Sequence, residues 1–239
     1  MVVKTKGIVI KSIKYGDNSA IVNVFTRQFG LMGFMVRGVY GKKASIKTSH
    51  LMPLNLLDLV FENHAKKNLQ SIKEINILDT FYSMDFSLGR QAMFAIHNEL
   101  LQQLLKENQQ NELLFDYLEH DLLPNLKQEP HFWQLPFDML SILHHYGCLP
   151  NIDTYKEGHC IDLKNGIFTS SDVNPRIENN VQVSKIIVEL INKGMLHLIK
   201  SNTLRNQTID CLIEYFRVHV NEHFQLRSRD VYYQMSGSS

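Results

Sequence analysis

The residues of this chain that could do chemistry are cations and aromatic rings concentrated in its first eighty positions. These positions hold twelve Lys or Arg against five Asp or Glu, a net charge of +7, whereas residues 81–239 hold thirteen against nineteen, a net charge of −6. Such charge asymmetry within one chain indicates nucleic-acid or acidic-surface binding by the basic part. A lysine surplus that serves solubility is the alternative, but it gives no reason to segregate the charge.

A polar, basic loop is expected at residues 41–49, whose sequence GKKASIKTS has three lysines and no acid. Lysine contacts phosphate as a mobile point charge, while aromatic faces stack on unpaired bases. Tyr40, at the mouth of this loop, is the best stacking candidate, with simple packing as the alternative. The other aromatic candidates are Tyr15, Phe25, Phe29 and Phe34. Most of the phenylalanines are expected in the core because strand aromatics at alternating positions usually face inward. The complete predicted DNA-binding set is Lys4, Lys6, Lys11, Lys14, Arg27, Arg37, Tyr40, Lys42, Lys43 and Lys47.

Short strands must position these residues. The pattern of β-branched residues and turn signals predicts five strands, over residues 2–13, 20–26, 31–39, 50–61 and 69–78. Five short strands in about eighty residues suit a small barrel, of which the OB-fold is the commonest five-stranded type. The sequence therefore predicts an N-terminal five-stranded OB-fold β-barrel domain at residues 1–80.

The apolar period then changes from that of strands to that of helices, which predicts a helical domain over residues 81–239 and an α+β multidomain chain. Helices are expected at 86–105, from Asn111 to a stop at Pro124, from Pro130 to Gly147 with a kink at Pro136, and at 181–192 and 207–223. A hairpin with Asn165-Gly166 at its turn is expected within residues 160–168. The last four residues are expected to be disordered.

No catalytic constellation is visible in the sequence. It contains no glycine-rich phosphate loop, no His-Glu-x-x-His and no Gly-x-Ser-x-Gly motif. We therefore expect a protein without catalytic residues or cofactor. A hydrolase or metalloenzyme centred on His144, His145 and His159 is the alternative, although histidines at a helix C-terminus more often interact with its dipole.

Membrane and secretory classes are not favoured. No apolar run approaches the eighteen residues of a membrane-spanning helix, and the N-terminal segment lacks a signal-peptide core. Three scattered cysteines do not make a disulfide framework. We expect a cytoplasmic protein with no membrane partner.

Several stretches resemble RecO proteins. Residues 7–39, GIVIKSIKYGDNSAIVNVFTRQFGLMGFMVRGV, follow that family's order of strand, Tyr-Gly turn, strand ending in Phe-Thr-Arg, Gly, and strand ending in Arg-Gly. The basic GKK loop and the HLMPL segment at 50–54 come next in the same order, and LRSR at 226–229 is similar to the family's C-terminal segment.

This resemblance implies a DNA repair and homologous recombination mediator with an N-terminal OB-fold and a helical domain. It implies binding to single- and double-stranded DNA, annealing of complementary strands and help in loading the recombinase onto strands coated by single-strand-binding protein. The implied partners are a RecR-type ring protein and the acidic C-terminal tail of single-strand-binding protein, at the bacterial nucleoid. Another OB-fold adaptor, for RNA or a ribosomal partner, is the alternative.

The chain departs from the family pattern in one region. Many members carry two Cys-x-x-Cys pairs in the helical domain, whereas residues 148–178 contain only Cys148 and Cys160. A rebuilt zinc site using these two and His159 stays open, but adjacent residues rarely reach one ion comfortably. We expect a degenerate, cysteine-poor zinc-ribbon-like region without metal. No helical-domain residue can be assigned from the sequence to binding of the single-strand-binding protein tail.

Overall fold

The computed structural model describes residues 1–40, 46–64, 66–80, 87–107, 109–128, 131–170, 180–194 and 201–237. The chain divides into two compact units. The first consists of Met1–Ser87 and Asn98–Gln128, and the second of Leu88–His97 and Glu129–Ser239.

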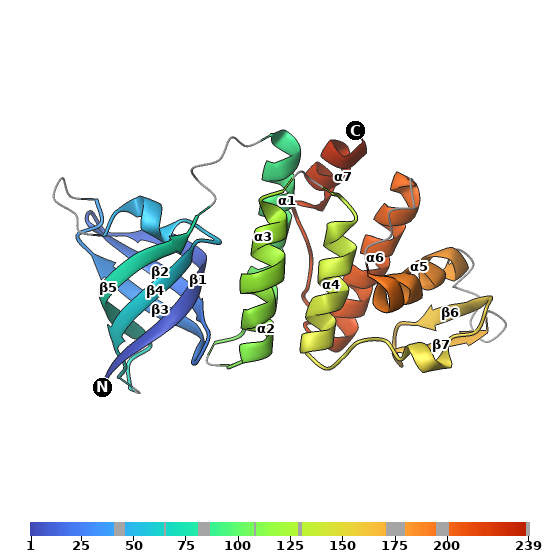
Figure 1. Ribbon diagram of the computed structural model, residues 1–239, viewed down its shortest axis with the longest axis horizontal. Coiled ribbons are helices and arrows are strands. Elements are labelled where there is room, and N and C mark those ends of the chain that lie inside the picture. The colour runs from blue at the N-terminus through green and yellow to red at the C-terminus, as the bar shows by residue number, and fades with distance from the viewer. Residues whose placement is uncertain are drawn as a thin grey trace. The chain divides into compact units, whose positions relative to one another are not determined.

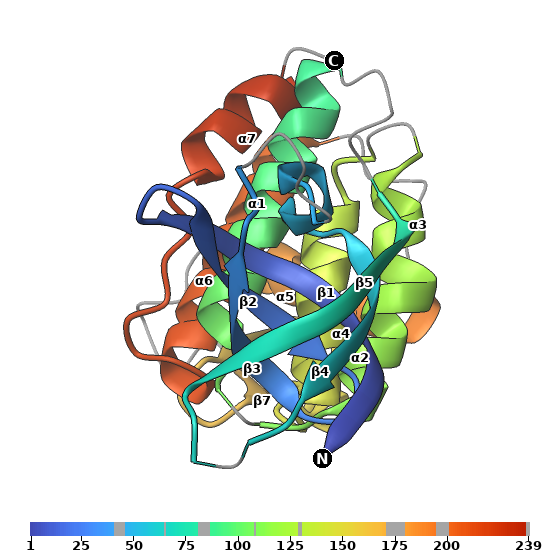
Figure 2. The same ribbon diagram turned by 90° about the vertical axis from the view of Figure 1, so that its left-hand side faces the viewer.

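The first unit is built on a closed five-stranded barrel (Figures 1 and 2). Its strands are β1 (Val2–Tyr15), β2 (Ser19–Thr26), β3 (Gly30–Arg37), β4 (Leu56–Glu62) and β5 (Leu69–Asp79). They follow one another around the barrel in the order β1-β2-β3-β5-β4, with β3 and β5 parallel and the other pairs antiparallel. The barrel and the helices that follow it confirm the predicted fold class.

Alternating apolar residues fill the barrel. Val22 of β2 and Phe34 of β3 are directly opposite each other and fully buried. Phe34 meets Phe61 of β4 edge to face, with ring centroids 5.2 Å apart, a favoured arrangement for aromatic pairs. Phe25 is buried as well, whereas Phe29 is only partly buried, so the prediction that most of these phenylalanines belong to the core is confirmed.

The fourth strand was predicted too long. Residues 50–55 do not belong to it, because Thr48–Leu51 form a short 3-10 helix, η1, and β4 begins only at Leu56. The turn after η1 is fixed to β1 by two backbone hydrogen bonds, from Leu54 N to Val9 O and from Val9 N to Asn55 O. Pro53 therefore lies in a turn, which does not need the backbone donor that proline lacks.

A helical segment belongs to the barrel's unit rather than to the second unit. It comprises α2 (Glu112–Tyr117), a π-helical turn η2 (Leu118–Leu122) and α3 (Leu123–Leu126). Asn111 caps α2 as predicted, its side chain accepting from Leu114 N at 2.9 Å. The ring of Phe115 packs 5.8 Å from that of Phe25. Residues 98–128 thus pack on the barrel, whereas the prediction placed everything beyond residue 80 in a separate helical domain.

Two predicted effects of proline were wrong. Pro124 does not stop the helix, because it lies in α3, which continues directly from the π-helical turn η2 and ends only at Leu126. Pro136 does not kink a helix that begins at Pro130, because α4 (Gln134–His145) starts later and Pro136 lies in its first turn.

The second unit contains the remaining helices. Besides α4 it has the first part of α1 (Leu88–Leu104), α5 (Asn180–Lys193), α6 (Asn202–His219) and α7 (Arg229–Gly237). The predicted hairpin is confirmed as β6 (His159–Asp162) and β7 (Ile167–Ser170), with Gly166 at a positive φ in the turn. α7 was not predicted, and its Ser236 is buried rather than disordered. Within the described residues, no helix has the length and apolar character needed to cross a membrane.

Candidate nucleic-acid interface

The β1–β2 hairpin exposes every residue at the end of β1. Lys11, Ser12, Ile13, Lys14 and Tyr15 are all exposed, although they continue a strand whose middle is fully buried. The opposite β2 residues Ala20 and Val22 are buried, so the partner strand is supported by the core while the end of β1 faces solvent. Figure 2 shows this hairpin at the end of the barrel opposite to the N-terminus.

Side chains that are directly opposite on neighbouring strands share a face of the sheet. The register places Tyr15 opposite Ser19 and Ser19 opposite Arg37. Two residues further along, Ile13, Ile21 and Met35 form the next row, and Lys11, Asn23 and Gly33 the third. One face therefore carries an exposed tyrosine, an arginine and a lysine around partly exposed apolar side chains. We call these three rows the β1–β3 face.

Lys14 and Tyr40 lie together at the same end. The Lys14 ammonium is 5.3 Å from the centroid of the Tyr40 ring, and 43% of Tyr40 is exposed. The segment is held in place by Asn18, whose carbonyl oxygen accepts from Gly38 N at 2.8 Å and Val39 N at 3.1 Å. A cation beside an exposed ring can bind a phosphate and a stacked base together.

The cations at this end are available for a ligand. Within the described part of the chain, Lys11, Lys14 and Arg37 make no ion pair with an acidic side chain. Lys47 is exposed at the start of η1. Lys42 and Lys43, also predicted to bind DNA, lie outside the described residues.

The other predicted cations are engaged by acids. Lys4 pairs with Asp58 of β4 at 2.9 Å, and Lys6 donates to Glu119 of η2. These pairs reduce the positive charge that the start of β1 offers to a ligand.

Arg27 fixes α2 to the barrel. Its guanidinium donates to both oxygens of Asp116, at 2.7 and 3.0 Å, and also pairs with Glu112 at 2.8 Å. The hydrogen bond from Arg27 lowers the pKa of Asp116, and the same bond raises that of the guanidinium. A bidentate pair of this kind positions the planar guanidinium, so Arg27 is a structural residue of the first unit.

Asp116, Glu119 and His120 bring their ligand atoms within 4.8 Å of one another. Asp116 and Glu119 already neutralise Arg27 and Lys6, and His120 Nδ1 lies 2.9 Å from the Asp116 carbonyl oxygen. The group is explained by these contacts. Cys148, His159 and Cys160 form no comparable cluster among the described residues, and the absence of a metal there stays a prediction.

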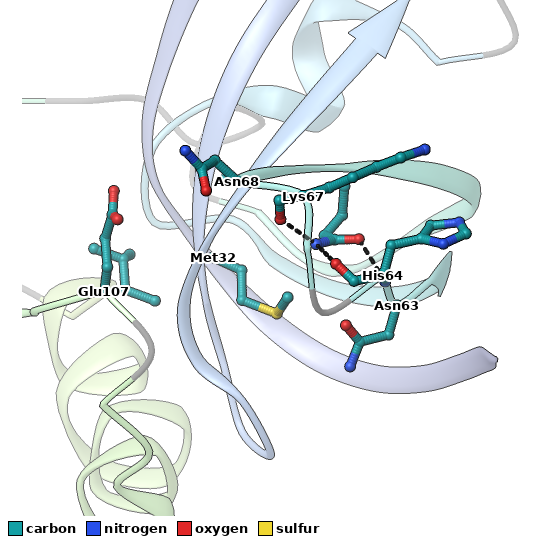
Figure 3. Close-up of a pocket in the computed structure, with 9 residues that line it drawn as sticks. Met32, Asn63, His64, Lys67, Asn68 and Glu107 are labelled. Carbon is teal, nitrogen blue, oxygen red and sulfur yellow. Dashed lines mark hydrogen bonds between the residues drawn. The ribbon is translucent and has the colours of Figure 1, made fainter.

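A pocket of about 190 Å³ opens beside β3, next to the β4–β5 loop (Figure 3). The sequence did not single out this pocket. It is lined by Leu31, Met32, Gly33, Asn63, His64, Lys67, Asn68, Gln70 and Glu107. In Figure 3, Met32 lies between Glu107 and Asn63, and the Lys67 side chain extends away from Glu107. Its amides and its single carboxylate form no recognisable motif in the sequence, because similar residues occur on any polar loop.

Arg205 of α6 is a buried cation of the second unit, with only 3% of it exposed. Its guanidinium lies over the rings of Phe132 and Tyr232, 5.6 and 6.0 Å from their centroids, and donates to Ser236 of α7. Burial lowers its pKa. Arg205 therefore holds α6 and α7 together.

A closed barrel of this strand order, with exposed tyrosines at one end and nearby cations that have no acidic partner among the described residues, defines a nucleic-acid-binding protein of the OB-fold class. The family described as "Recombination protein O N terminal" matches residues 1–81. DNA repair protein RecO of Bacteroides fragilis is 30% identical, over 97% of this chain and 98% of the relative. The RecO proteins of Phocaeicola vulgatus and Flavobacterium psychrophilum are each 28% identical, over the same shares. The chain belongs to the RecO family of DNA repair and recombination proteins.

Proposed function

We propose that this protein binds single- and double-stranded DNA through the β1–β3 face together with the adjoining Lys14 and Tyr40, and that it anneals complementary strands. The observation that carries the proposal is the grouping of Lys11, Lys14 and Arg37, without acidic partners among the described residues, around exposed Tyr15 and Tyr40. A single strand binds such a surface by phosphate contacts to the cations and base stacking on the rings.

Annealing follows from neutralising two strands on one protein. Complementary strands repel each other through their phosphates, and cations that bind both lower that repulsion. No covalent step is needed, so we propose that the protein acts without catalytic residues or a cofactor. We also propose that Lys42, Lys43 and Lys47 add phosphate contacts, and that their replacement with Ala weakens DNA binding.

The family supports three further proposals. The protein helps load the recombinase onto strands coated by single-strand-binding protein, it contacts the acidic C-terminal tail of that protein, and it works with a RecR-type ring protein. The site of action is the nucleoid in the cytoplasm. The net charge of −6 over residues 81–239 supports a role in protein contact rather than DNA contact for most of that region.

The deciding experiment measures the annealing rate of complementary DNA strands, naked and coated with single-strand-binding protein. We expect acceleration in both cases. No acceleration in either case would reject the annealing proposal. Acceleration confined to RNA strands would favour the alternative of an RNA adaptor.

A further inference from the structure

We propose that the pocket beside β3 binds one unstacked nucleobase that carries an exocyclic amino group, as cytosine, adenine and guanine do. This inference deepens the proposed function, because it rests on single-strand binding by the barrel and names what the strand inserts there. The pocket lies entirely within the first unit, between Met32 and Gly33 of β3, the β4–β5 loop and Glu107.

The pocket wall is held in place before any ligand binds. The buried side chain of Gln70 accepts from His64 N at 2.9 Å and donates to the carbonyl oxygens of His64, at 3.0 Å, and Lys67, at 2.8 Å. The turn is closed by a further bond from Lys67 N to His64 O, at 3.0 Å. Three hydrogen bonds of one buried amide, both donors and one acceptor site, are made to this loop, and a loop fixed in advance costs less entropy on binding.

The lining matches the edge of a base. The side chains of Asn63, Asn68 and Glu107 border the pocket and make no hydrogen bond with other described residues. Amide groups offer both donors and acceptors, whereas an ionised carboxylate only accepts. A carboxylate therefore accepts from the amino group of a base such as cytosine, and thymine has no such group. The thioether of Met32 supplies a polarizable apolar surface for the ring.

The pocket continues the β1–β3 face. Gly33, which lines the pocket, is opposite Asn23, and Asn23 is opposite Lys11. A Cβ atom at Gly33 would lie 2.8 Å from Leu69 Cδ2 and 3.3 Å from the backbone carbonyl oxygen of Asn68. Glycine therefore lets the β4–β5 loop pack closely against β3 here. From Gly33 to Arg37 the strand spans about 13 Å. A single DNA strand a few nucleotides long thus reaches from the cations to the pocket, and this length is within the usual site size of an OB-fold.

The size of the pocket is consistent with a single base. Sites for whole drug-sized molecules usually occupy about 300–1,000 Å³, which is more than the 190 Å³ found here. Lys67 borders the pocket with its side chain directed away from Glu107 (Figure 3), a position suited to the phosphate outside.

The test uses the full-length protein and single strands of about twelve thymidines. One central position is thymidine, deoxycytidine, deoxyadenosine or an abasic site, and the dissociation constant is measured by fluorescence anisotropy. We expect the strands with deoxycytidine or deoxyadenosine to bind about fivefold more tightly than the all-thymidine and abasic strands. In Glu107→Gln the ratio should fall to about one, because an amide can donate to thymine as well as accept from an amino group.

Glu74→Gln is the matched control, since it removes the same charge from an exposed position on β5. Glu74→Gln should keep the preference for strands with deoxycytidine or deoxyadenosine. It should change the affinity for all strands by the same amount as Glu107→Gln, because both variants remove one negative charge. Equal affinity of the unchanged protein for all four strands would reject the pocket and leave DNA binding intact. A preference that survives Glu107→Gln would also reject it. Failure to bind any strand would instead reject the proposed function on which this inference rests.

Discussion

The two ends of strand β1 carry equal numbers of lysines, but these lysines differ in what they contact. Near the start, Lys4 pairs with Asp58 and Lys6 with Glu119. Near the end, Lys11 and Lys14 have no acidic partner among the described residues, and Lys14 lies over Tyr40 instead. The local sequence of the two ends is similar, so the difference comes from acids that folding brings to one end only. The number of cations in the sequence of β1 is therefore an upper limit on the number that can contact DNA phosphates.

The largest expected effect comes from removing the unpaired cations. Lys11→Ala, Lys14→Ala and Arg37→Ala together should weaken single-strand binding and flatten its salt dependence. Each lost phosphate contact lowers the log–log slope by about 0.7, so the triple variant should lose about 2. Fluorescence anisotropy over a salt series measures both quantities.

The matched triple variant is Lys4→Ala, Lys6→Ala and Arg27→Ala, which removes the same charge from the paired cations. We expect its slope to change little. If both triple variants flatten the slope equally, DNA responds to net charge alone and the two ends of β1 are equivalent.

The next effect concerns the exposed rings. Tyr15→Ala and Tyr40→Ala should each weaken single-strand binding by about 1–3 kcal/mol if a base stacks on that ring. The salt slope should stay unchanged, because no phosphate contact is lost. Tyr→Phe at each position keeps the stacking face and should bind as the unchanged protein does; a loss in the Phe variants would show that the hydroxyl rather than the ring matters.

A smaller effect should follow from releasing a paired cation. Glu119→Gln leaves Lys6 without its partner and should raise the salt slope by at most about 0.7, the value of one additional phosphate contact. Glu222→Gln, at an exposed position in the second unit, serves as the control for the change in net charge. Equal gains in the two variants would show that Lys6 does not reach DNA even when it is free.

The smallest effect is on stability at acid pH. The folded-state pKa of Asp116 is below its ordinary value of 3.8 because Arg27 donates to it. The pair therefore stabilises the fold above pH 3.8, and this contribution is lost as the pH falls through the lower folded-state pKa. Both side chains are about one-third exposed, so the contribution is modest.

Arg27→Ala should remove this pH-dependent contribution, so that the variant is less stable than the unchanged protein above pH 3.8 but loses less stability as the pH falls below that value. Urea unfolding followed by circular dichroism across the acid range measures the change. Arg37→Ala is the control, since Arg37 has no ion pair among the described residues. Identical pH profiles for the two variants would contradict the proposed role of the Arg27–Asp116 pair.

Local patterns in the sequence were sufficient for much of the fold. Runs of β-branched residues between turn signals predicted the five strands, Asn111 marked the start of a helix, and Asn165-Gly166 marked a hairpin. These features depend on residues close together in the chain. The packing partner of a helix is a different matter, because an amphipathic pattern shows that residues 98–128 bury one face but does not show that the barrel covers it.

The sequence by itself determined that the basic charge belongs to the β-rich part of this protein, because charge is a property of composition. Only the tertiary structure decided which cations remain unpaired. Lys6 and its partner Glu119 are 113 residues apart, and no local rule connects them. The pocket depends on folding in the same way, since Met32, Asn63 and Glu107 come from three distant segments.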